Sequence, residues 1–355
     1  MLQKFDESEL RVLGQYPVVE SDIFTFPGVF VDKLNTPITP KENLERFFNR
    51  SGALWVPDVN TDLNFIYPAL MPDSIACGWS GGPDAFGCEW VPDTSSPDLP
   101  AFPKPGAVML KDIADWKDLN WPDPSKWDWE KGEEEYSVLD PDRPRAVFIW
   151  TSLFERMITL MTFENAAMAL LEDPDSCIDF VKRLEEYNIS LIEHCHKYLH
   201  TDIIVMSDDW GSQKAPFFSD TVASEIFAPH VAALAKRTHE LGMKFMHHCC
   251  GNSAAFVPIM IDEGVDWWQY NYEAVQDSIE ETVRTYGDRI FFDGYPGYVQ
   301  PLADDDDAFC KEVRSLYKRL AGGMNSSFSI VDAKPDRGLD LRKFCYQVAR
   351  ETAVQ

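Results

Sequence analysis

The chain has 355 residues and a mass of 40.5 kDa, which suits one large α/β domain rather than a small module. Its net charge of −27 and isoelectric point near 4.5 disfavour nucleic acid or an anionic membrane surface as a partner, because both would repel it. Hydrophobic residues make up 45% and charged residues 26%, so a sizeable core can form.

No apolar run is long enough to span a membrane, and the first residues, Met1 to Glu7, lack the basic and then apolar pattern of a signal peptide. The eight cysteines are scattered along the chain, which favours reduced thiols or metal ligands over a disulfide scaffold. We therefore expect a cytoplasmic protein.

Residues 1–38 show no strong period and are predicted to form an N-terminal extension. Thr39-Pro40-Lys41-Glu42 is a capping box with proline at the first helical position, which predicts a helix over 40–49. The apolar run 53–57 predicts the first barrel strand. Residues 58–144 are rich in Pro, Gly, Asp and Trp with little helical period, so we expect them to form a cap or lid.

After residue 145, apolar strands alternate with amphipathic helices, which implies parallel strands joined by right-handed crossovers. The number of units predicts a (β/α)8 TIM barrel over 39–355. An open, doubly wound sheet is the alternative, but no predicted strand is followed by the glycine-rich phosphate loop of a dinucleotide fold. The predicted strands are 145–150, 202–206, 244–247, 266–270, 289–293 and 327–330, and the predicted helices lie near 163–171, 174–199, 221–241, 253–263, 274–286, 304–320 and 339–352.

Polar residues follow several of these strands directly, and in such barrels the chemistry lies at the carboxyl ends of the strands. The most informative group is His248-Cys249-Cys250-Gly251. An imidazole and a thiolate two residues apart point to the same side of a strand, and they offer nitrogen and sulfur ligands suited to Zn²⁺. The alternative is that these side chains are buried core residues with hydrogen bonds inside the barrel mouth.

A zinc site needs a third ligand, and Glu273 or Asp209, at the ends of the adjacent strands, are both within reach. Cys249 and His247 form a second pair with the opposite register. Asp208 and Asp209 adjoin each other, so only one is expected to face the barrel axis, and we predict that it is Asp209. The alternative is that both acids are solvated in a loop.

Taken together, these segments resemble the uroporphyrinogen decarboxylase superfamily, in particular its corrinoid-dependent methyltransferase branch, over nearly everything after residue 36. The fold that this resemblance implies is the same barrel. The supporting stretches are Thr39 to Leu44, Asp84-Ala85-Phe86-Gly87-Cys88-Glu89-Trp90, Phe154-Glu155-Arg156-Met157, Phe163-Glu164-Asn165, Asp208-Asp209-Trp210-Gly211 and His248 to Gly251.

The chain departs from two patterns within this superfamily. The basic R-Q-A-G-R segment with which the decarboxylases hold a porphyrinogen is missing, which disfavours that reaction. Methyltransferases of the superfamily add a third cysteine ligand shortly after the last glycine pair, where this chain has Gly322-Gly323-Met324. A thiol acceptor is therefore less favoured. The more distantly similar methionine synthases carry a glutamate ligand at about the spacing of Glu273, so the metal set that the resemblance implies is His248, Cys250 and Glu273, with Asp209 or water as a fourth ligand.

The F-G-x-E-W stretch at 86–90 looks most like members that take methyl groups from methoxylated aromatic compounds or similar small donors. The resemblance thus implies an anaerobic methyltransferase that moves a methyl group to the Co(I) of a separate corrinoid protein, with Asp209, His248 and Glu273 as catalytic residues. The alternatives are a decarboxylase-like lyase, a methylcobamide:thiol methyltransferase of the coenzyme M type, and a non-catalytic tetrapyrrole binder; a homodimer stays open. The candidates for substrate contact, each with core packing as its default role, are Trp90, Trp150, Trp210, Tyr270, Tyr295 and Asp293.

Overall fold

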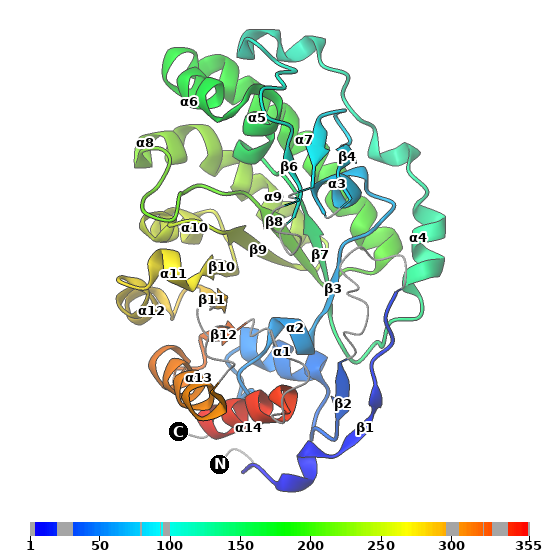
Figure 1. Cartoon of the computed structure of the whole chain (residues 1–355), viewed down its shortest axis with the longest axis vertical. Helices are drawn as coiled ribbons and strands as arrows, with labels where there is room; N and C mark the ends of the chain where they lie inside the picture. The colour runs from blue at the N-terminus through cyan, green and yellow to red at the C-terminus, as the bar shows by residue number, and fades with distance from the viewer. Residues whose placement is uncertain are drawn as a thin grey trace.

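The computed structural model describes residues 4–19, 31–78, 80–92, 94, 100–295, 305–321, 323–328 and 340–353. Seven parallel strands form one sheet in this part of the chain, in the order β12–β11–β10–β9–β8–β7–β3. The sheet curls into a half-barrel (Figure 1), which confirms the predicted barrel class. The strands are β3 (Asn64–Ile66), β7 (Arg145–Ile149), β8 (Ile203–Ser207), β9 (Lys244–Cys249), β10 (Trp267–Asn271), β11 (Phe291–Tyr295) and β12 (Ser326–Phe328).

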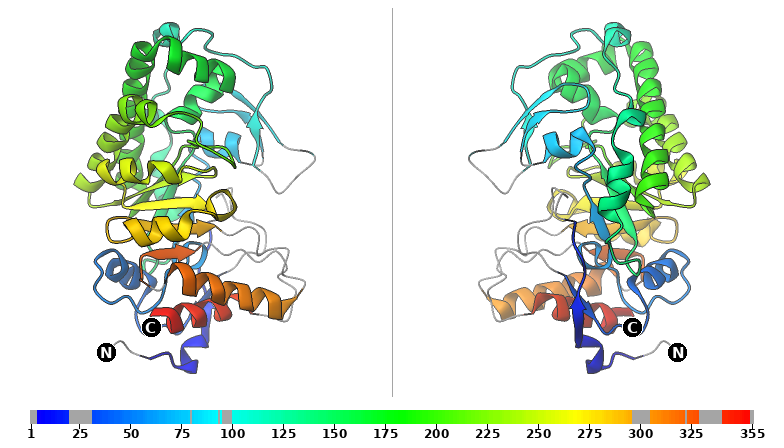
Figure 2. Two further views of the ribbon diagram at one scale, coloured as in Figure 1. Left: turned by 90° about the vertical axis from the view of Figure 1, so that its left-hand side faces the viewer. Right: turned by 90° about the vertical axis from the view of Figure 1, so that its right-hand side faces the viewer.

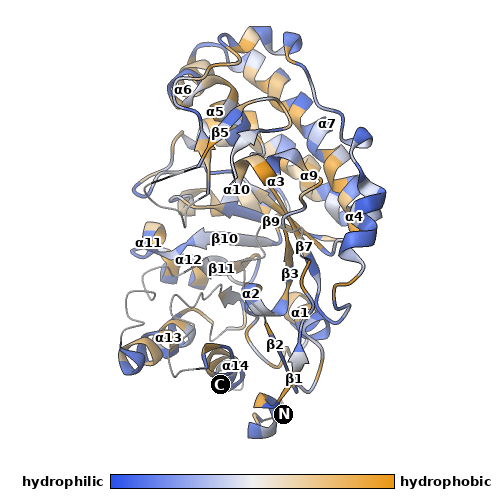
Figure 3. Ribbon diagram, turned by 45° about the vertical axis from the view of Figure 1, so that its right-hand side comes forward, coloured by the Kyte–Doolittle hydropathy of each residue, from blue (hydrophilic) through white to orange (hydrophobic). Residues whose placement is uncertain are grey.

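Helices cover the outer face of this sheet, and their polar and apolar residues alternate with the helical period, as the colouring of α7 (Pro174–Leu199) shows in Figure 3. The bounds predicted for this helix are confirmed. Among the described residues, no helix is long and apolar enough to cross a membrane. The other main helices are α1 (Pro40–Phe48), α5 (Phe154–Met161), α6 (Phe163–Glu172), α9 (Ala228–Glu240), α10 (Val257–Asp262), α12 (Ile279–Tyr286), α13 (Asp306–Leu320) and α14 (Leu341–Ala353).

The remaining elements are short. A π-helical turn, Ala223–Phe227, joins α8 (Asp220–Val222) to α9, so the single helix predicted over 221–241 is interrupted. Likewise, the helix predicted over 274–286 is divided into α11 (Tyr272–Val275) and α12. The other short helices are α2 (Val59–Asp62), α3 (Pro72–Cys77), α4 (Trp129–Tyr136) and the 3-10 turns η1 (Glu7–Leu10), η2 (Ile113–Asp118), η3 (Pro124–Lys126) and η5 (Ala254–Phe256).

The strand predicted at 53–57 is wrong. The segment is buried, as its apolar pattern indicated, but the Asn43 side chain takes up its polar backbone groups: Asn43 Oδ1 accepts from the N–H groups of Leu54 and Trp55, and Asn43 Nδ2 donates to the Trp55 carbonyl. With those groups satisfied, no ladder forms there. The segment ends in a single parallel bridge from Asp58 to Phe328 of β12, and the strand beside β7 is β3 instead.

Alternate residues of the sheet point to the barrel interior, as the period of two along a strand requires. Phe148, Val205, Met246, Trp267 and Phe291 form one inner cluster. Their immediate neighbours in sequence pack outward against the helices in a larger cluster. This alternation decides which residues at the strand ends face the mouth of the barrel.

The N-terminal residues are held against the end of the barrel. A short antiparallel pair, β1 (Val12–Gln15) and β2 (Asp32–Leu34), follows η1. Glu9 accepts hydrogen bonds from Arg350 and Tyr346 of α14, and both Glu9 and Arg350 are buried. The described part of the predicted N-terminal extension is thus fixed to the last helix by a buried ion pair.

The segment predicted as a lid has three different parts. Its first part supplies β3 of the main sheet. A later part, from η2 to α4, lies along α7, where Trp116 and Trp121 contact Phe180. The part between them forms a small antiparallel sheet of β4 (Gly82–Pro83), β5 (Glu89–Val91) and β6 (Phe102–Pro103). In Figure 2 this small sheet lies on the side toward which the strands of the barrel point.

A buried ion network holds the small sheet to the barrel. The guanidinium of Arg156, on α5, donates to Asp84 Oδ2 at 2.6 Å and to Asp73 Oδ2 at 2.7 Å. Asp84 also accepts from Trp90 Nε1 at 3.1 Å. All three charged side chains are at most 5% exposed. Because their charges are removed from water, each depends on the others for its stability.

We predict that Arg156→Ala lowers the free energy of unfolding by about 3–5 kcal/mol, because two buried carboxylates lose their positive partner. Lys236→Ala is the matched control, since the Lys236–Glu240 pair is exposed and its loss is expected to cost at most about 1 kcal/mol. Denaturant titration followed by tryptophan fluorescence measures both. Equal small losses in the two variants would show that the buried network contributes nothing.

Candidate functional site

The site lies at the carboxyl ends of the central strands, where five polar residues occupy one row across the sheet. In the register of the parallel strands, Ser207 pairs with His248, His248 with Gln269, Gln269 with Asp293, and Asp293 with Ser327. Side chains in one row of a parallel sheet point to the same face. The ring of His248 contacts Phe148 of the inner cluster at 5.4 Å between centroids, so this row faces the barrel interior.

Hydrogen bonds run along this row and fix the state of His248. Ser327 Oγ donates to one carboxylate oxygen of Asp293 at 2.5 Å, and Gln269 Nε2 donates to the other at 2.7 Å. The amide of Gln269 therefore presents Oε1 to His248 Nδ1, at 2.6 Å. Since an amide oxygen only accepts, Nδ1 carries the proton, and the lone pair of the neutral imidazole is on Nε2.

Three potential metal ligands meet at that lone pair. His248 Nε2 lies 3.1 Å from Cys250 Sγ, and the backbone N–H of Cys250 donates to Asp209 Oδ1 at 2.5 Å. One ligand atom from each of Asp209, His248 and Cys250 lies within 4.8 Å of the other two. The nitrogen, sulfur and oxygen atoms of this group are ligands that Zn²⁺ accepts.

Two glycines allow the loops after β8 and β9 to come this close. A Cβ added to Gly251 would lie 1.6 Å from the Gly211 carbonyl oxygen, and a Cβ added to Gly211 would lie 2.3 Å from that of Asn252. The loops also share a hydrogen bond from Asn252 N to the Ser212 carbonyl at 2.7 Å. The glycine that ends His248-Cys249-Cys250-Gly251 is thus required where Asp209 and Cys250 approach each other.

Asp208 and Asp209 point in different directions, in agreement with the sequence prediction. Asp208 accepts from the backbone N–H groups of Leu153 and Glu155 at the start of α5, and from Trp210 Nε1. Burial raises the pKa of Asp208 to about 6, and these hydrogen bonds partly oppose the increase. Asp208 therefore fixes the start of α5, while Asp209 belongs to the ligand group.

The surroundings of the ligand group disfavour negative charge on Cys250 and Asp209. Burial raises the pKa of Cys250 well above its usual range, and the Asp209 carboxylate raises it further. Burial also raises the pKa of Asp209, against the opposing effects of His248 and of the Cys250 N–H group. The anionic forms of both groups are thus disfavoured by their surroundings. A bound cation would reverse this, because it stabilises a thiolate and a carboxylate together.

Glu273 lies outside this ligand group, unlike the set that the family resemblance implied. It follows β10 at the start of α11, where its backbone N–H donates to Asn271 Oδ1 at 3.0 Å. The side-chain atom Oε2 of Glu273 is buried without a hydrogen-bond partner. The structure brings Asp209 to His248 and Cys250 in the place where Glu273 was expected.

Two of the aromatic candidates are packed in the core. Trp210 is 0% exposed and contacts Phe218 and Phe256, and Tyr270 is also 0% exposed and points outward, against Trp268. Both side chains lie on the side of the sheet that the helices cover, which contradicts the predicted contact with substrate. Asp293 is likewise 0% exposed and acts on His248 through Gln269.

The other aromatic candidates have different positions. Trp150 lies on the inner side, 4.8 Å from Phe148 between ring centroids, and packs against the cluster that contains Trp90 of the small sheet. Trp90 and Trp150 therefore connect the small sheet to the mouth. The backbone of Tyr295 ends β11, but its side chain lies outside the described residues.

Glu155 is a residue at the mouth that sequence reasoning passed over. Its Oε2 accepts from Ser207 Oγ at 3.0 Å, which places the carboxylate at the level of His248. Burial raises the pKa of Glu155 well above its usual range, and the nearby Asp209 and Asp208 raise it further. The stretch Phe154-Glu155-Arg156-Met157 was noted as part of the family resemblance, but nothing in its spacing distinguished Glu155 from a helix-start acid.

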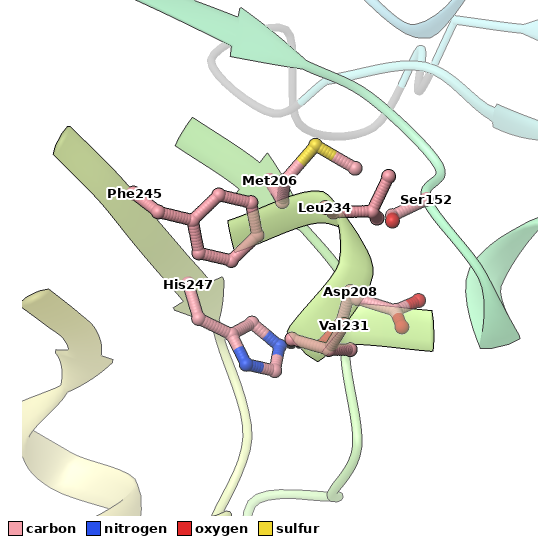
Figure 4. A pocket seen from close by; sticks show the side chains of 7 residues that line it. All are labelled: Ser152, Met206, Asp208, Val231, Leu234, Phe245 and His247. Carbon is pink, nitrogen blue, oxygen red and sulfur yellow. Dashed lines mark hydrogen bonds between the residues drawn. The ribbon is translucent and has the colours of Figure 1, made fainter. Parts of the chain in front are cut away.

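A small cavity lies behind the site, between the sheet and α9 (Figure 4). Its lining includes Asp208, His247 and Ser152, and its volume is about 10 Å³. This is about the space of one water molecule, too small for an organic substrate. Burial lowers the pKa of His247 to about 4, so this imidazole is neutral near neutral pH. The cavity and His247 belong to the packing that supports β9, and the His247–Cys249 pair faces away from the mouth.

No protein-family model matches the chain, and no curated protein is similar to it in sequence. Solved structures are similar in fold. A methyltransferase from Methanosarcina mazei superposes with a TM-score of 0.60 at 15% sequence identity, over 90% of this chain and 100% of that one. The fold is that of this methyltransferase.

Two other barrel enzymes are more weakly similar. A D-psicose 3-epimerase has a TM-score of 0.39 at 10% identity, over 68% of this chain and 85% of that one. A 3-keto-L-gulonate-6-phosphate decarboxylase from Vibrio cholerae has a TM-score of 0.31 at 11% identity, over 70% of this chain and 94% of that one.

We predict that neutral His248 carries its proton on Nδ1 and that Gln269→Leu, which removes the acceptor, increases the fraction with the proton on Nε2. Long-range ¹H–¹⁵N correlation spectra at alkaline pH distinguish the two tautomers. His247 is the internal control: its Nε2 faces the Asp208 carbonyl, so its own tautomer should not change. A wild-type spectrum with the His248 proton on Nε2 would contradict the arrangement along the row.

Proposed function

We propose that this protein is a methyltransferase that binds Zn²⁺ through Asp209, His248 and Cys250 at the mouth of its barrel. The observation that carries the proposal is the convergence of the His248 lone pair, the Cys250 sulfur and the Asp209 carboxylate within 4.8 Å. The fold shared with a methyltransferase supports the reaction class. A metal at this position would act as a Lewis acid toward a substrate oxygen.

The residues around the group fit this metal in two respects. The hydrogen bond from Nδ1 to Gln269 leaves Nε2 as the coordinating nitrogen, and Asp293 in turn holds Gln269. Zn²⁺ would also offset the charge of a Cys250 thiolate and of the Asp209 carboxylate, which destabilise each other without a cation. In catalytic zinc sites three protein ligands leave a fourth position open for a substrate or water, and these three residues would do so here.

The proposed donor is a methoxylated aromatic compound or a similar small methyl donor, and the proposed acceptor is the Co(I) of a separate corrinoid protein that docks over the mouth. In the transfer, the bond between the methyl carbon and the aryl oxygen breaks, and its electron pair stays on that oxygen. The electron pair of Co(I) forms the new bond to carbon. The activation barrier comes from the negative charge that develops on the phenolate oxygen. The ligand group at the strand ends would lower this barrier by stabilising that charge.

Aromatic side chains at the mouth would orient the methyl donor. Trp150 and Trp90 line the side of the mouth next to Phe148, and an aromatic ring would stack there with its methoxy group directed toward His248. The other members of the row of His248 are buried, which holds this ligand on a rigid base; they are Ser207, Gln269, Asp293 and Ser327.

We predict that wild-type protein binds about one zinc per chain and that Cys250→Ser and His248→Ala lose it. Asp293→Ala, which does not contact the metal, should weaken zinc binding about 10–100-fold, because it removes the acceptor that holds the Gln269 amide against His248. Cys310→Ser is the control, since Cys310 lies on α13, away from the group. Zinc titration with a chromogenic chelator measures all four variants. A wild-type protein that purifies and titrates without zinc contradicts the metal part.

A separate prediction concerns the reaction. Wild-type protein should demethylate a methoxyarene when a reduced corrinoid protein is present, and Asp209→Ala should reduce the rate at least about 100-fold by removing a ligand beside the reacting oxygen. Phenol release and methylation of the corrinoid, followed by absorbance, measure it. Demethylation without corrinoid, or equal rates for the variant, would refute the proposed reaction.

A further inference from the structure

In the part of the chain that the structure describes, the Glu155 carboxylate at the mouth forms no ion pair. Its carboxylate accepts from Ser207 Oγ, and Ser207 pairs in register with His248 on the next strand. The carboxylate therefore lies roughly one strand spacing, about 4.8 Å, and one hydrogen bond away from the imidazole, a distance comparable with the width of a substituted aromatic ring.

The basic residue beside Glu155 is already engaged. Arg156 donates to Asp73, Asp84 and Thr151 and is 1% exposed in its side chain, so its charge is offset by the Asp73 and Asp84 carboxylates. Zinc would not supply the missing charge either. A divalent ion on the Cys250 thiolate and the Asp209 carboxylate would be neutral overall, so the Glu155 carboxylate would still need a cation against it to be stable in its charged form.

Aromatic rings form the neighbouring wall. Trp150 lies 4.8 Å from Phe148 and 6.0 Å from Tyr67 between ring centroids, and Phe148 lies 5.4 Å from His248. The wall thus extends from the ligand group to the loop that follows β3. Aromatic faces attract cations as well as other rings, and a carboxylate beside such a wall strengthens that preference.

We propose that Glu155 is a specificity-determining residue that selects methyl donors whose aromatic ring carries a positively charged substituent, such as an ammonium group. The inference rests on the proposed function and narrows its donor. The ring would lie against Trp150, the methoxy group at the ligand group, and the ammonium group on the Glu155 carboxylate. Donors that carry a carboxylate would be repelled by Glu155 and stripped of solvent without a partner.

The test uses three probes that differ only in charge: 4-methoxybenzylamine, 4-methoxybenzyl alcohol and 4-methoxybenzoate. Binding to the zinc-loaded protein is measured by calorimetry, which does not require methyl transfer. We expect the amine to bind at least roughly tenfold more tightly than the alcohol, and the benzoate to bind more weakly than both, because the charge-assisted hydrogen bond to Glu155 forms only with the amine.

Glu155→Gln keeps the shape of the side chain and removes its charge. The ratio of amine to alcohol affinity should fall to about one, and the affinity for the benzoate should rise relative to that for the alcohol. Each ratio is taken within one variant, so a partial loss of folded protein does not affect it. Glu164→Gln removes an exposed carboxylate from α6 and should keep the wild-type ratio. If Glu155→Gln does not fold, the order of the three binding affinities for the wild-type protein still tests the proposal.

The binding assay tests the role of Glu155, and the methyl-transfer assay tests the proposed reaction. Equal affinities for the three probes, a preference for the benzoate, no binding of any probe, or an amine preference that survives Glu155→Gln would each overturn the role of Glu155. Selective binding of the amine without any methyl transfer to reduced corrinoid would uphold that role and overturn the proposed reaction.

Discussion

The register of the parallel strands is the constraint on which the site depends. Because β8 to β12 pair without a shift, Ser207, His248, Gln269, Asp293 and Ser327 fall in one row and face the same side. A slip of one residue on any strand would turn its member of the row toward the helices. The hydrogen bonds from Ser327 to His248 can form only in this register, and through them the buried carboxylate of Asp293 sets which nitrogen of His248 is free.

Two pairs of buried acidic residues near the mouth have different surroundings. Asp73 and Asp84 are matched by a buried guanidinium, and this network fixes the small sheet beside the mouth. Within the described residues Asp209 and Glu155 form no ion pair with a guanidinium or an ammonium group, and burial disfavours their charged forms. A buried acid without a cation lowers stability, so its presence at a strand end indicates a role in binding. The same reasoning motivates the proposed metal at Asp209 and the proposed cationic substituent at Glu155.

The similarity to a methyltransferase at 15% identity shows how little of the sequence the barrel itself requires. Alternate apolar residues in the strands and one apolar stripe on each helix suffice for the layers, and many residues satisfy that pattern. The site is more demanding, because its ligands must meet at distances of a few ångströms. Gly211 and Gly251 illustrate this, since no side chain fits between the two loops that bring Asp209 to Cys250.

The sequence by itself determined most of the strands and helices after residue 145, the barrel class and the inward direction of His248 and Cys250, because these follow from local periodicity and from the two-residue repeat of a strand. It also indicated Asp209 rather than Asp208 as the inward acid. It missed α5 and the breaks within the helices predicted over 221–241 and 274–286. The tertiary structure decided the rest. The third ligand atom near His248 and Cys250 is that of Asp209 and not Glu273, Trp210 and Tyr270 are core residues, and the buried segment at 53–57 is bound by Asn43 instead of a strand. Each of these outcomes depends on which distant segments come into contact, and the local pattern along a chain does not encode that.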